Sequence, residues 1–174
     1  ENPQAARETA KLARFEGNAG QSFLYFAQEG GRSVRIVLLA VADGEAADYV
    51  KAGGDLLAKV QTCGAKSIAV HAENLDAKAA AEVAYGATLR NWRMDKYRTK
   101  LPETAKPTIT DLTLVGAPVE AMTMWPSYVA IADGVALTKE LVSEPANIIY
   151  PESFVERCQH LQSLGVEIHV LDDK

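Results

Sequence analysis

Hydrophobic and polar residues along the first quarter of the chain follow the pattern of β-strands. Residues 22–27 and 33–41 are rich in aromatic and β-branched residues, and Gly30 and Gly31 lie between them, which predicts a hairpin. The second segment has apolar residues on both faces near its end, which is typical of a strand covered by helices. A turn is predicted at residues 42–44, where Gly44 follows Asp43.

A helical repeat replaces this alternation further along the chain. Residues 45–62 carry apolar or small residues at helical spacing, and Gly53 and Gly54 within them predict close packing of this helix against the sheet. Asp76 is a suitable N-cap for an alanine-rich helix that ends near residue 89. Short strands are predicted at residues 67–71 and 108–115. Strands that alternate with helices predict an α/β domain with a mixed sheet flanked by helices, ending near Gly116.

The last third of the chain has a different organisation. Residues 118–126 are predicted to be a linker and residues 127–142 a helix, after which a proline-containing loop leads to a second helix that begins at Pro151. Gly165 is expected to end that helix, and residues 166–171 alternate as a half-buried strand. We therefore divide the chain into an N-terminal domain (1–117), a linker with an interdomain helix (118–143) and the start of a second α/β domain (144–174).

Composition and charge exclude several classes of protein. The 174 residues carry a formal net charge of −5, which gives no general attraction for nucleic acid or an anionic membrane. The longest apolar run, residues 36–42, is far shorter than the roughly 20 residues of a membrane span, so no membrane partner is expected. Cys63 and Cys158 are the only cysteines and predict a reducing, cytoplasmic setting rather than a disulfide framework.

The titratable residues do not form a recognisable catalytic or metal-binding motif. The three histidines are His71, His160 and His169, and their spacing matches no metal motif. Cys158 lies on the apolar face of its predicted helix and is expected to be a buried, inert thiol, whereas Cys63 could be exposed. Asp172 and Asp173 are expected to be solvated.

A basic segment with interleaved aromatic residues follows the alanine-rich helix. Its cations are Arg90, Arg93, Lys96, Arg98 and Lys100, and Trp92 and Tyr97 lie between them. This composition is typical of a nucleic-acid surface, but Asp95 interrupts the segment and the domain as a whole is acidic. Contacts between domains or subunits use the same residue types, and we favour that interpretation.

Two segments resemble a known family. Ser143-Glu-Pro-Ala-Asn147 is similar to the Asn-Glu-Pro-Ala-Asn motif of the leucyl (cytosol) aminopeptidases, and Met94-Asp-Lys-Tyr-Arg-Thr-Lys100 is similar to a Phe-Asp-Lys-Tyr-Lys-Thr segment of their N-terminal domain. Tyr150 stands where the family has a threonine that would cap the next helix, which predicts a cap weaker by about 1 kcal/mol unless the backbone is satisfied by another group. In the motif, Pro145 and Pro151 are expected to set the path and Asn147 to tie the loop.

The resemblance implies both a fold and a function. It implies a two-domain, hexameric, cytoplasmic enzyme that uses two divalent metal ions (zinc or manganese) to release N-terminal residues, preferably leucine, from peptides. Its N-terminal domain is similar to macro domains and its catalytic and metal residues lie in the second domain, so we assign none of either to this chain and expect it to bind no metal. The chain is expected to serve assembly and active-site access. One alternative is DNA binding by the basic segment; a weaker one, suggested by the macro-like fold, is ADP-ribose binding.

Overall fold

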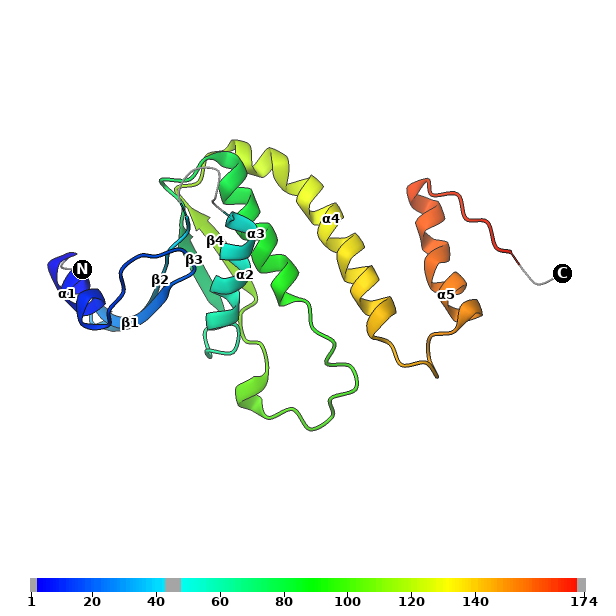
Figure 1. Ribbon diagram of the computed structural model, residues 1–174, viewed down its shortest axis with the longest axis horizontal. Coiled ribbons are helices and arrows are strands. Elements are labelled where there is room, and N and C mark those ends of the chain that lie inside the picture. Colours follow the sequence, from blue (N-terminus) through cyan, green and yellow to red (C-terminus); the bar gives the residue numbers. More distant parts are fainter. Residues whose placement is uncertain (1–2, 43–47, 172–174) are drawn as a thin grey trace. The chain divides into compact units, whose positions relative to one another are not determined.

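A computed structural model describes residues 3–42 and 48–171 of the chain. It contains two compact units, an N-terminal unit (Glu1–Ala132) and a C-terminal unit (Asp133–Lys174), which are described separately. Figure 1 shows the elements in chain order. The predicted turn at 42–44, the first residues of the predicted helix at 45–62, and the Asp172–Asp173 pair fall wholly or partly outside the described residues.

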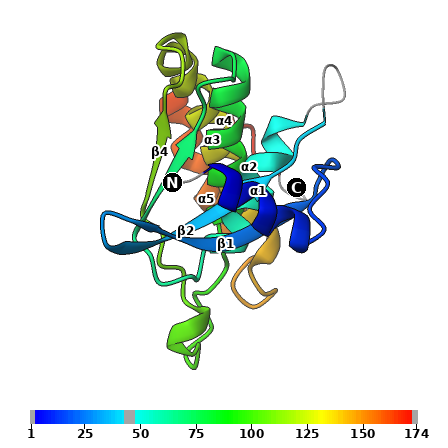
Figure 2. The ribbon, with the colours of Figure 1, turned by 90° about the vertical axis from the view of Figure 1, so that its left-hand side faces the viewer.

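The N-terminal unit begins with a helix and a β-hairpin. Helix α1 (Pro3–Leu12) precedes strands β1 (Ser22–Glu29) and β2 (Arg32–Leu39), which pair antiparallel and confirm the predicted hairpin (Figure 2). Gly30 and Gly31 form the turn with φ of 54° and 77°, a region that glycine enters without steric cost.

The remaining strands form a second small sheet. Strands β3 (Ser67–His71) and β4 (Asp111–Val115) pair in parallel, and the chain between them passes through helix α3 (Ala77–Asn91). Asp76 caps α3, as predicted, because its carboxylate accepts a 2.7 Å hydrogen bond from the backbone N–H of Ala79. The α/β class is confirmed, with the described strands arranged as two two-stranded sheets where we expected one mixed sheet.

Helices α2 (Tyr49–Val60) and α3 meet at two glycines (Figure 1). A Cβ atom added to Gly53 would lie 1.9 Å from the carbonyl oxygen of Val83, and one added to Gly86 would lie 1.8 Å from that of Val50. Both glycines are therefore required for the backbones to approach this closely. The sequence correctly predicted close packing at Gly53, but the partner is α3 and not the sheet.

Two apolar clusters stabilise this unit. The first comprises Leu57, Val60, Ala87 and Ile109, against which Val37, Ile68 and Leu112 pack. The second comprises Ala72, Ala80, Ala81 and Ala121. All four residues of the second cluster are alanines, and two of them, Ala80 and Ala81, belong to the alanine-rich α3.

Helix α4 (Glu120–Ser143) begins earlier than the sequence predicted. Residues 120–126 are helical and not a linker, although Pro126 removes one helical hydrogen bond. Ala121 is buried in the second cluster and Met124 packs against it, so burial of apolar surface offsets the missing hydrogen bond. None of the helices in the part of the chain that the structure describes is long and apolar enough to cross a bilayer.

The C-terminal unit contains the end of α4 and a second helix. Helix α5 (Pro151–Cys158) continues as a 3₁₀ helix (Gln159–Leu164), which Gly165 ends with φ 87°, as predicted. The predicted strand at residues 166–171 is wrong, because these residues have no regular structure. A strand needs a neighbour that accepts and donates ladder hydrogen bonds, and none pairs with it among residues 3–42 and 48–171.

Candidate interaction surface and junction motif

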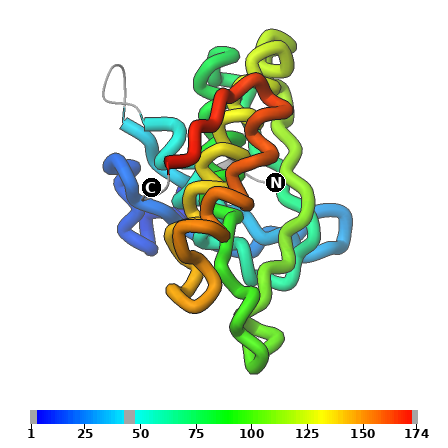
Figure 3. Tube along the Cα trace, turned by 90° about the vertical axis from the view of Figure 1, so that its right-hand side faces the viewer, coloured from blue at the N-terminus to red at the C-terminus, as the bar shows by residue number. Residues whose placement is uncertain are grey.

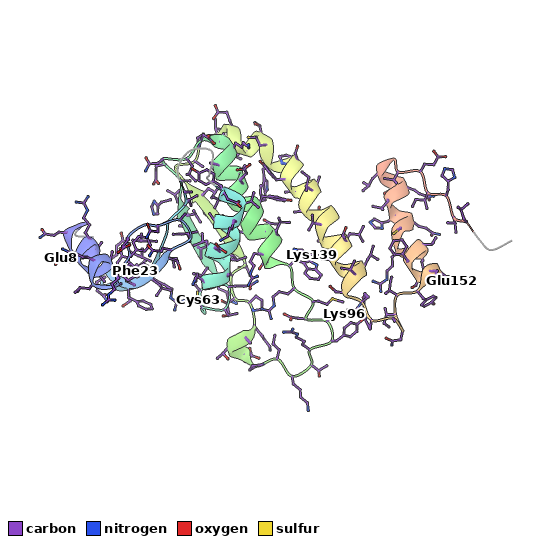
Figure 4. The ribbon with its side chains drawn as sticks, in the orientation of Figure 1. Glu8, Phe23, Cys63, Lys96, Lys139 and Glu152 are labelled. Atoms are coloured by element: carbon purple, nitrogen blue, oxygen red, sulfur yellow. The ribbon has the colours of Figure 1, made fainter. Side chains whose placement is uncertain are left out.

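The basic segment (residues 90–100) starts in the last turn of α3 and continues as an irregular loop. Trp92 has extended backbone dihedrals (φ −64°, ψ 133°), which turn the chain out of the helix. Lys96 projects from this loop in Figure 4. The predicted cations Arg90, Arg98 and Lys100 are also exposed, whereas Arg93 is half-buried.

Asp95 forms ion pairs with two of the arginines in this loop. Its Oδ2 accepts a hydrogen bond from Nε of Arg93 at 2.5 Å, and its Oδ1 lies 3.7 Å from Nε of Arg98. The hydrogen bond from Arg93 holds the pKa of Asp95 below its usual range, and the charge of the two guanidinium groups adds to this effect. One carboxylate thus partly neutralises two of the five cations.

The cations of the segment therefore do not form one continuous array. The structure brings Arg93 and Arg98 to Asp95 and places Nζ of Lys96 5.5 Å from the ring centroid of Tyr97. Sequence reasoning treated Asp95 only as an interruption of positive charge. The sequence did contain a signal that Asp95 pairs with an arginine, because Asp95 and Arg98 have the i, i+3 spacing of an ion pair.

The junction motif (residues 143–151) links α4 to α5. The carbonyl of Pro145 accepts hydrogen bonds from the backbone N–H groups of Ile148 (2.8 Å) and Ile149 (3.0 Å), which folds the loop into a compact turn. Asn147 is exposed, and the role of its side chain in tying the loop stays a prediction. The turn is closed by the carbonyl of Pro145, and the side chain of the preceding Glu144 has no solvent exposure.

Ser153 supplies one hydrogen bond at the start of α5. Oγ of Ser153 accepts a 2.9 Å hydrogen bond from the backbone N–H of Tyr150 and can donate to the carbonyl of Ile148 at 2.9 Å. Ser153 therefore satisfies a donor at the start of the helix from inside its first turn. Pro151 occupies the first helical position, where the absence of an N–H group costs nothing.

Arg157 connects α5 to the junction motif. Its Nη1 lies 3.1 Å from Oε1 of Glu144 and 3.4 Å from Oε1 of Glu140, near the end of α4. The sequence analysis missed this cluster because the partners are 13 and 17 residues apart, and no helical spacing relates them.

A groove of about 620 Å³ follows β4 in the N-terminal unit. Every residue from Thr110 to Leu114 lines it and no residue of β3 does, so it lies along the β4 edge that faces away from β3. Small residues of α3 and the first residues of α4, including Met122 and Trp125, form its walls. Asp111 is its only titratable lining residue, so the groove lacks the acid–base or nucleophilic pair that a catalytic site requires.

The other titratable candidates are dispersed. His71 ends β3, as predicted, and its Nδ1 lies 2.9 Å from Glu73, which lowers the pKa of that carboxyl. His160 and His169 have separate local partners. Both cysteines are half-buried, so the prediction that Cys158 is buried is wrong, and Cys63, which Figure 4 labels, packs against the first apolar cluster. Across residues 3–42 and 48–171, no three His, Cys, Asp or Glu side chains are grouped to hold a metal ion. These residues do not fit the two divalent ions that the resemblance implies.

Comparison with known proteins identifies the family. Residues 4–101 match the model of the N-terminal domain of the cytosol aminopeptidase family. This chain belongs to that family. The matched range includes α2, α3 and the basic segment up to its last cation, Lys100.

Curated relatives extend the likeness along nearly the whole chain. A probable cytosol aminopeptidase of Caulobacter vibrioides is 36% identical over 165 residues, which cover 92% of this chain and 33% of that protein. The corresponding proteins of Rhizobium etli and Gluconobacter oxydans are each 35% identical and are covered to 35% of their length. The chain thus spans about a third of the length of the relatives it matches.

Two solved structures share the fold. A tomato leucine aminopeptidase mutant has a TM-score of 0.74 at 24% identity, covering 91% of this chain and 32% of that one. The bottromycin maturation enzyme BotP, solved in complex with Mn, has a TM-score of 0.69 at 20% identity, covering 90% and 33% of the two chains. At these identities, the two structures establish the fold alone.

Proposed function

We propose that this chain is the N-terminal region of a metal-dependent leucyl aminopeptidase that releases N-terminal residues, preferably leucine, from peptides. The observation that carries the proposal is the match of residues 4–101 to the N-terminal domain of the cytosol aminopeptidase family. The names of the curated relatives support a cytoplasmic location and an aminopeptidase activity for the parent protein. The parent is proposed to assemble as a homo-hexamer.

In this proposal the chain itself does no chemistry. The two divalent ions (zinc or manganese) belong to the catalytic domain of the parent, where they activate water and polarise the scissile carbonyl when bound. The dispersal of acidic residues and histidines supports this division, because they do not converge in the described part of the chain. The closely packed α2–α3 pair provides a rigid body whose surface can serve subunit assembly and shape access to the active site.

The proposal that this chain has no catalytic activity of its own is tested by assaying the purified 174-residue chain on leucine p-nitroanilide with Mn²⁺. We expect no turnover above the metal-only blank, while the full-length Caulobacter vibrioides relative serves as the positive control. Metal-dependent turnover by the 174-residue chain that disappears with a chelator would contradict the proposal, because it would require metal ligands within this segment.

DNA binding is the alternative that the basic segment supports. It has five cations in eleven residues, but the pairing of Arg93 and Arg98 with Asp95 reduces the charge available to phosphates. This pairing favours a protein–protein contact, in which guanidinium and aromatic groups are common. Tyr97, which is half exposed, lies beside these cations.

A mobility-shift titration with duplex DNA separates the two interpretations. We expect no shift at about 0.15 M salt, because a phosphate-binding surface needs several unpaired cations. A salt-dependent shift that is lost in the Arg93→Glu, Arg98→Glu double variant but kept in Lys59→Glu would establish the DNA alternative. Lys59 is a suitable control because it lies in the last turn of α2, outside the segment.

A further inference from the structure

Strand β4 has one open edge in the part of the chain that the structure describes. Its backbone pairs with β3 on one side only, and Figure 2 shows β4 as the outer of the two strands. The carbonyl of Val115 accepts a 2.9 Å hydrogen bond from the N–H of Ala72, so Val115, and with it Thr113, faces β3. Backbone groups of alternate residues point to opposite sides of a strand, so Leu112 and Leu114 direct their N–H and C=O groups away from β3.

These backbone groups face the groove that runs along β4. One wall consists of small residues of α3, such as Ala84 and Thr88, and the other of the start of α4, into which the loop after β4 leads directly (Figure 3). Val119 and Met122 line this second wall and are 69% and 75% exposed. Asp111, at the beginning of β4, is the only titratable lining residue. The groove therefore combines unpaired backbone donors and acceptors with apolar walls.

The β4 edge lacks most of the features that protect exposed edges in soluble proteins. Such edges usually carry lysine, proline or a β-bulge, which prevent pairing with another strand. Residues 111–115 (Asp-Leu-Thr-Leu-Val) contain neither lysine nor proline, and their register with β3 is unbroken. Backbone groups beside apolar walls cost free energy unless water or a further strand satisfies them. The edge is therefore suited to pairing with another strand.

We propose that the β4 edge is the docking site of one further β-strand, supplied by a segment of the parent protein outside residues 1–174. The added strand bonds to the backbones of Leu112 and Leu114 and packs apolar side chains against Met122. The groove has no titratable residue besides Asp111, so the matching strand is apolar, with a cation only where it passes Asp111. This step rests on the proposed function, which makes the chain one part of a longer protein.

The parent protein is a better source of this strand than a second copy of the chain. About two thirds of the Caulobacter vibrioides relative lies outside the matched range, so a parent of that size has ample chain to supply a strand. A segment of the same polypeptide also reaches the groove at a high effective concentration. In a second copy, by contrast, β4 is flanked by its own α3 and α4, whose side chains would meet those of the first copy.

The test is amide hydrogen exchange, measured by mass spectrometry with single-residue resolution on the 174-residue chain and on the full-length parent. We expect the amides of Leu112 and Leu114 to exchange about a hundredfold more slowly in the parent, where the added strand accepts their hydrogen bonds. The amides of Thr113 and Val115 point to β3 and serve as internal references, with similar protection in both proteins. Equal exchange of Leu112 and Leu114 in the two proteins would overturn the proposal.

Two variants of the parent test the groove itself. Met122→Glu places a charge in the apolar wall and should speed the exchange of Leu112 and Leu114 in the parent by at least about tenfold. Thr123→Glu adds the same charge at the neighbouring exposed residue, which does not line the groove, and should leave both rates unchanged. Equal changes in the two variants would contradict docking in the groove.

Two further outcomes separate this proposal from its alternatives. Protection of Leu112 and Leu114 in the 174-residue chain that rises with its concentration would identify a second copy as the occupant and overturn the proposal. The aminopeptidase activity of the parent is measured separately. Protection without activity would contradict the proposed function and support the added strand, whereas activity without protection would support the function and overturn the strand.

Discussion

Different interactions stabilise each of the two units of the chain internally. In the N-terminal unit, the backbones of α2 and α3 touch, and two apolar clusters include residues of these helices. In the described part of the C-terminal unit, the end of α4 and α5 are linked by Arg157, two carboxylates and a turn built on Pro145. The contacts in the N-terminal unit depend on close packing, whereas the link between α4 and α5 depends on ion pairs and hydrogen bonds.

This difference predicts how each unit responds to change. A close-packed interior transmits any added volume as strain, so the N-terminal unit has little freedom to adjust. The described part of the C-terminal unit has no comparable buried apolar interior, so it accommodates added volume more easily. The chain therefore combines a close-packed unit with one that is loosely packed in its described part.

The largest expected effect comes from filling the contact between α2 and α3. Gly86→Ala places a methyl group 1.8 Å from the carbonyl oxygen of Val50, and neither the Cβ, whose position the backbone fixes, nor the backbone oxygen can rotate away. We expect a loss of about 3 kcal/mol in the free energy of unfolding, at the upper end for an overpacked core. Chemical denaturation of the 174-residue chain, followed by circular dichroism, measures it.

Two other helical glycines provide matched controls. An alanine Cβ at Gly54 would lie 3.6 Å from its nearest neighbour, the carbonyl oxygen of Gly86, and one at Gly134, in the C-terminal unit, would meet nothing within 4 Å. Both substitutions should be neutral or stabilise the chain by up to about 1 kcal/mol, because alanine favours the helix. If Gly86→Ala behaves like Gly134→Ala, then the contrast between the two units is wrong.

The sequence predicted the elements whose signals are local. Asp76 caps α3, Pro151 begins α5 and Gly165 ends the 3₁₀ helix that continues it, because each of these roles depends on the residue's own backbone preferences or on bonds within one turn. The hairpin around Gly30 and Gly31 was predictable for the same reason. The presence of α2 and α3 followed from periodicity, which is also a local property.

Features that depend on distant partners were not predictable in this way. Pro126 indicated a linker, yet burial of Ala121 keeps the surrounding residues helical. Apolar and polar residues alternate at 166–171 as in a strand, but a strand also needs a neighbouring strand for its hydrogen bonds, and none of the described strands pairs with these residues. The sequence analysis did not predict the Arg157–Glu144 ion pair, because the loop between α4 and α5 brings these residues together and no regular spacing relates them. In the candidate surface, residue types gave the five cations, while the role of Asp95 needed coordinates.

The smallest predicted effect concerns charge on the surface of the N-terminal unit. The hydrogen bond from Arg93 lowers the pKa of Asp95, so the folded state binds a proton at this carboxyl less readily than the unfolded state. The resulting stabilisation is present above about pH 4, the ordinary range of the group, and is lost as the pH falls through the lowered pKa. Titration of the Asp95 carboxyl carbon by NMR measures the shift directly.

Substitution of Arg93 and Arg98 one at a time separates their contributions to the lowered pKa of Asp95. Arg93→Met should return the pKa of Asp95 most of the way to its ordinary value, because the hydrogen bond from Arg93 is the main cause of the shift. Arg98→Met should change it less, since Nε of Arg98 lies 3.7 Å away and its side chain is 62% exposed. An ordinary pKa for Asp95 in the wild type would show that the pair does not persist in solution. Arg93 would then be free of its carboxylate, and the argument against DNA binding by the basic segment would lose its physical basis.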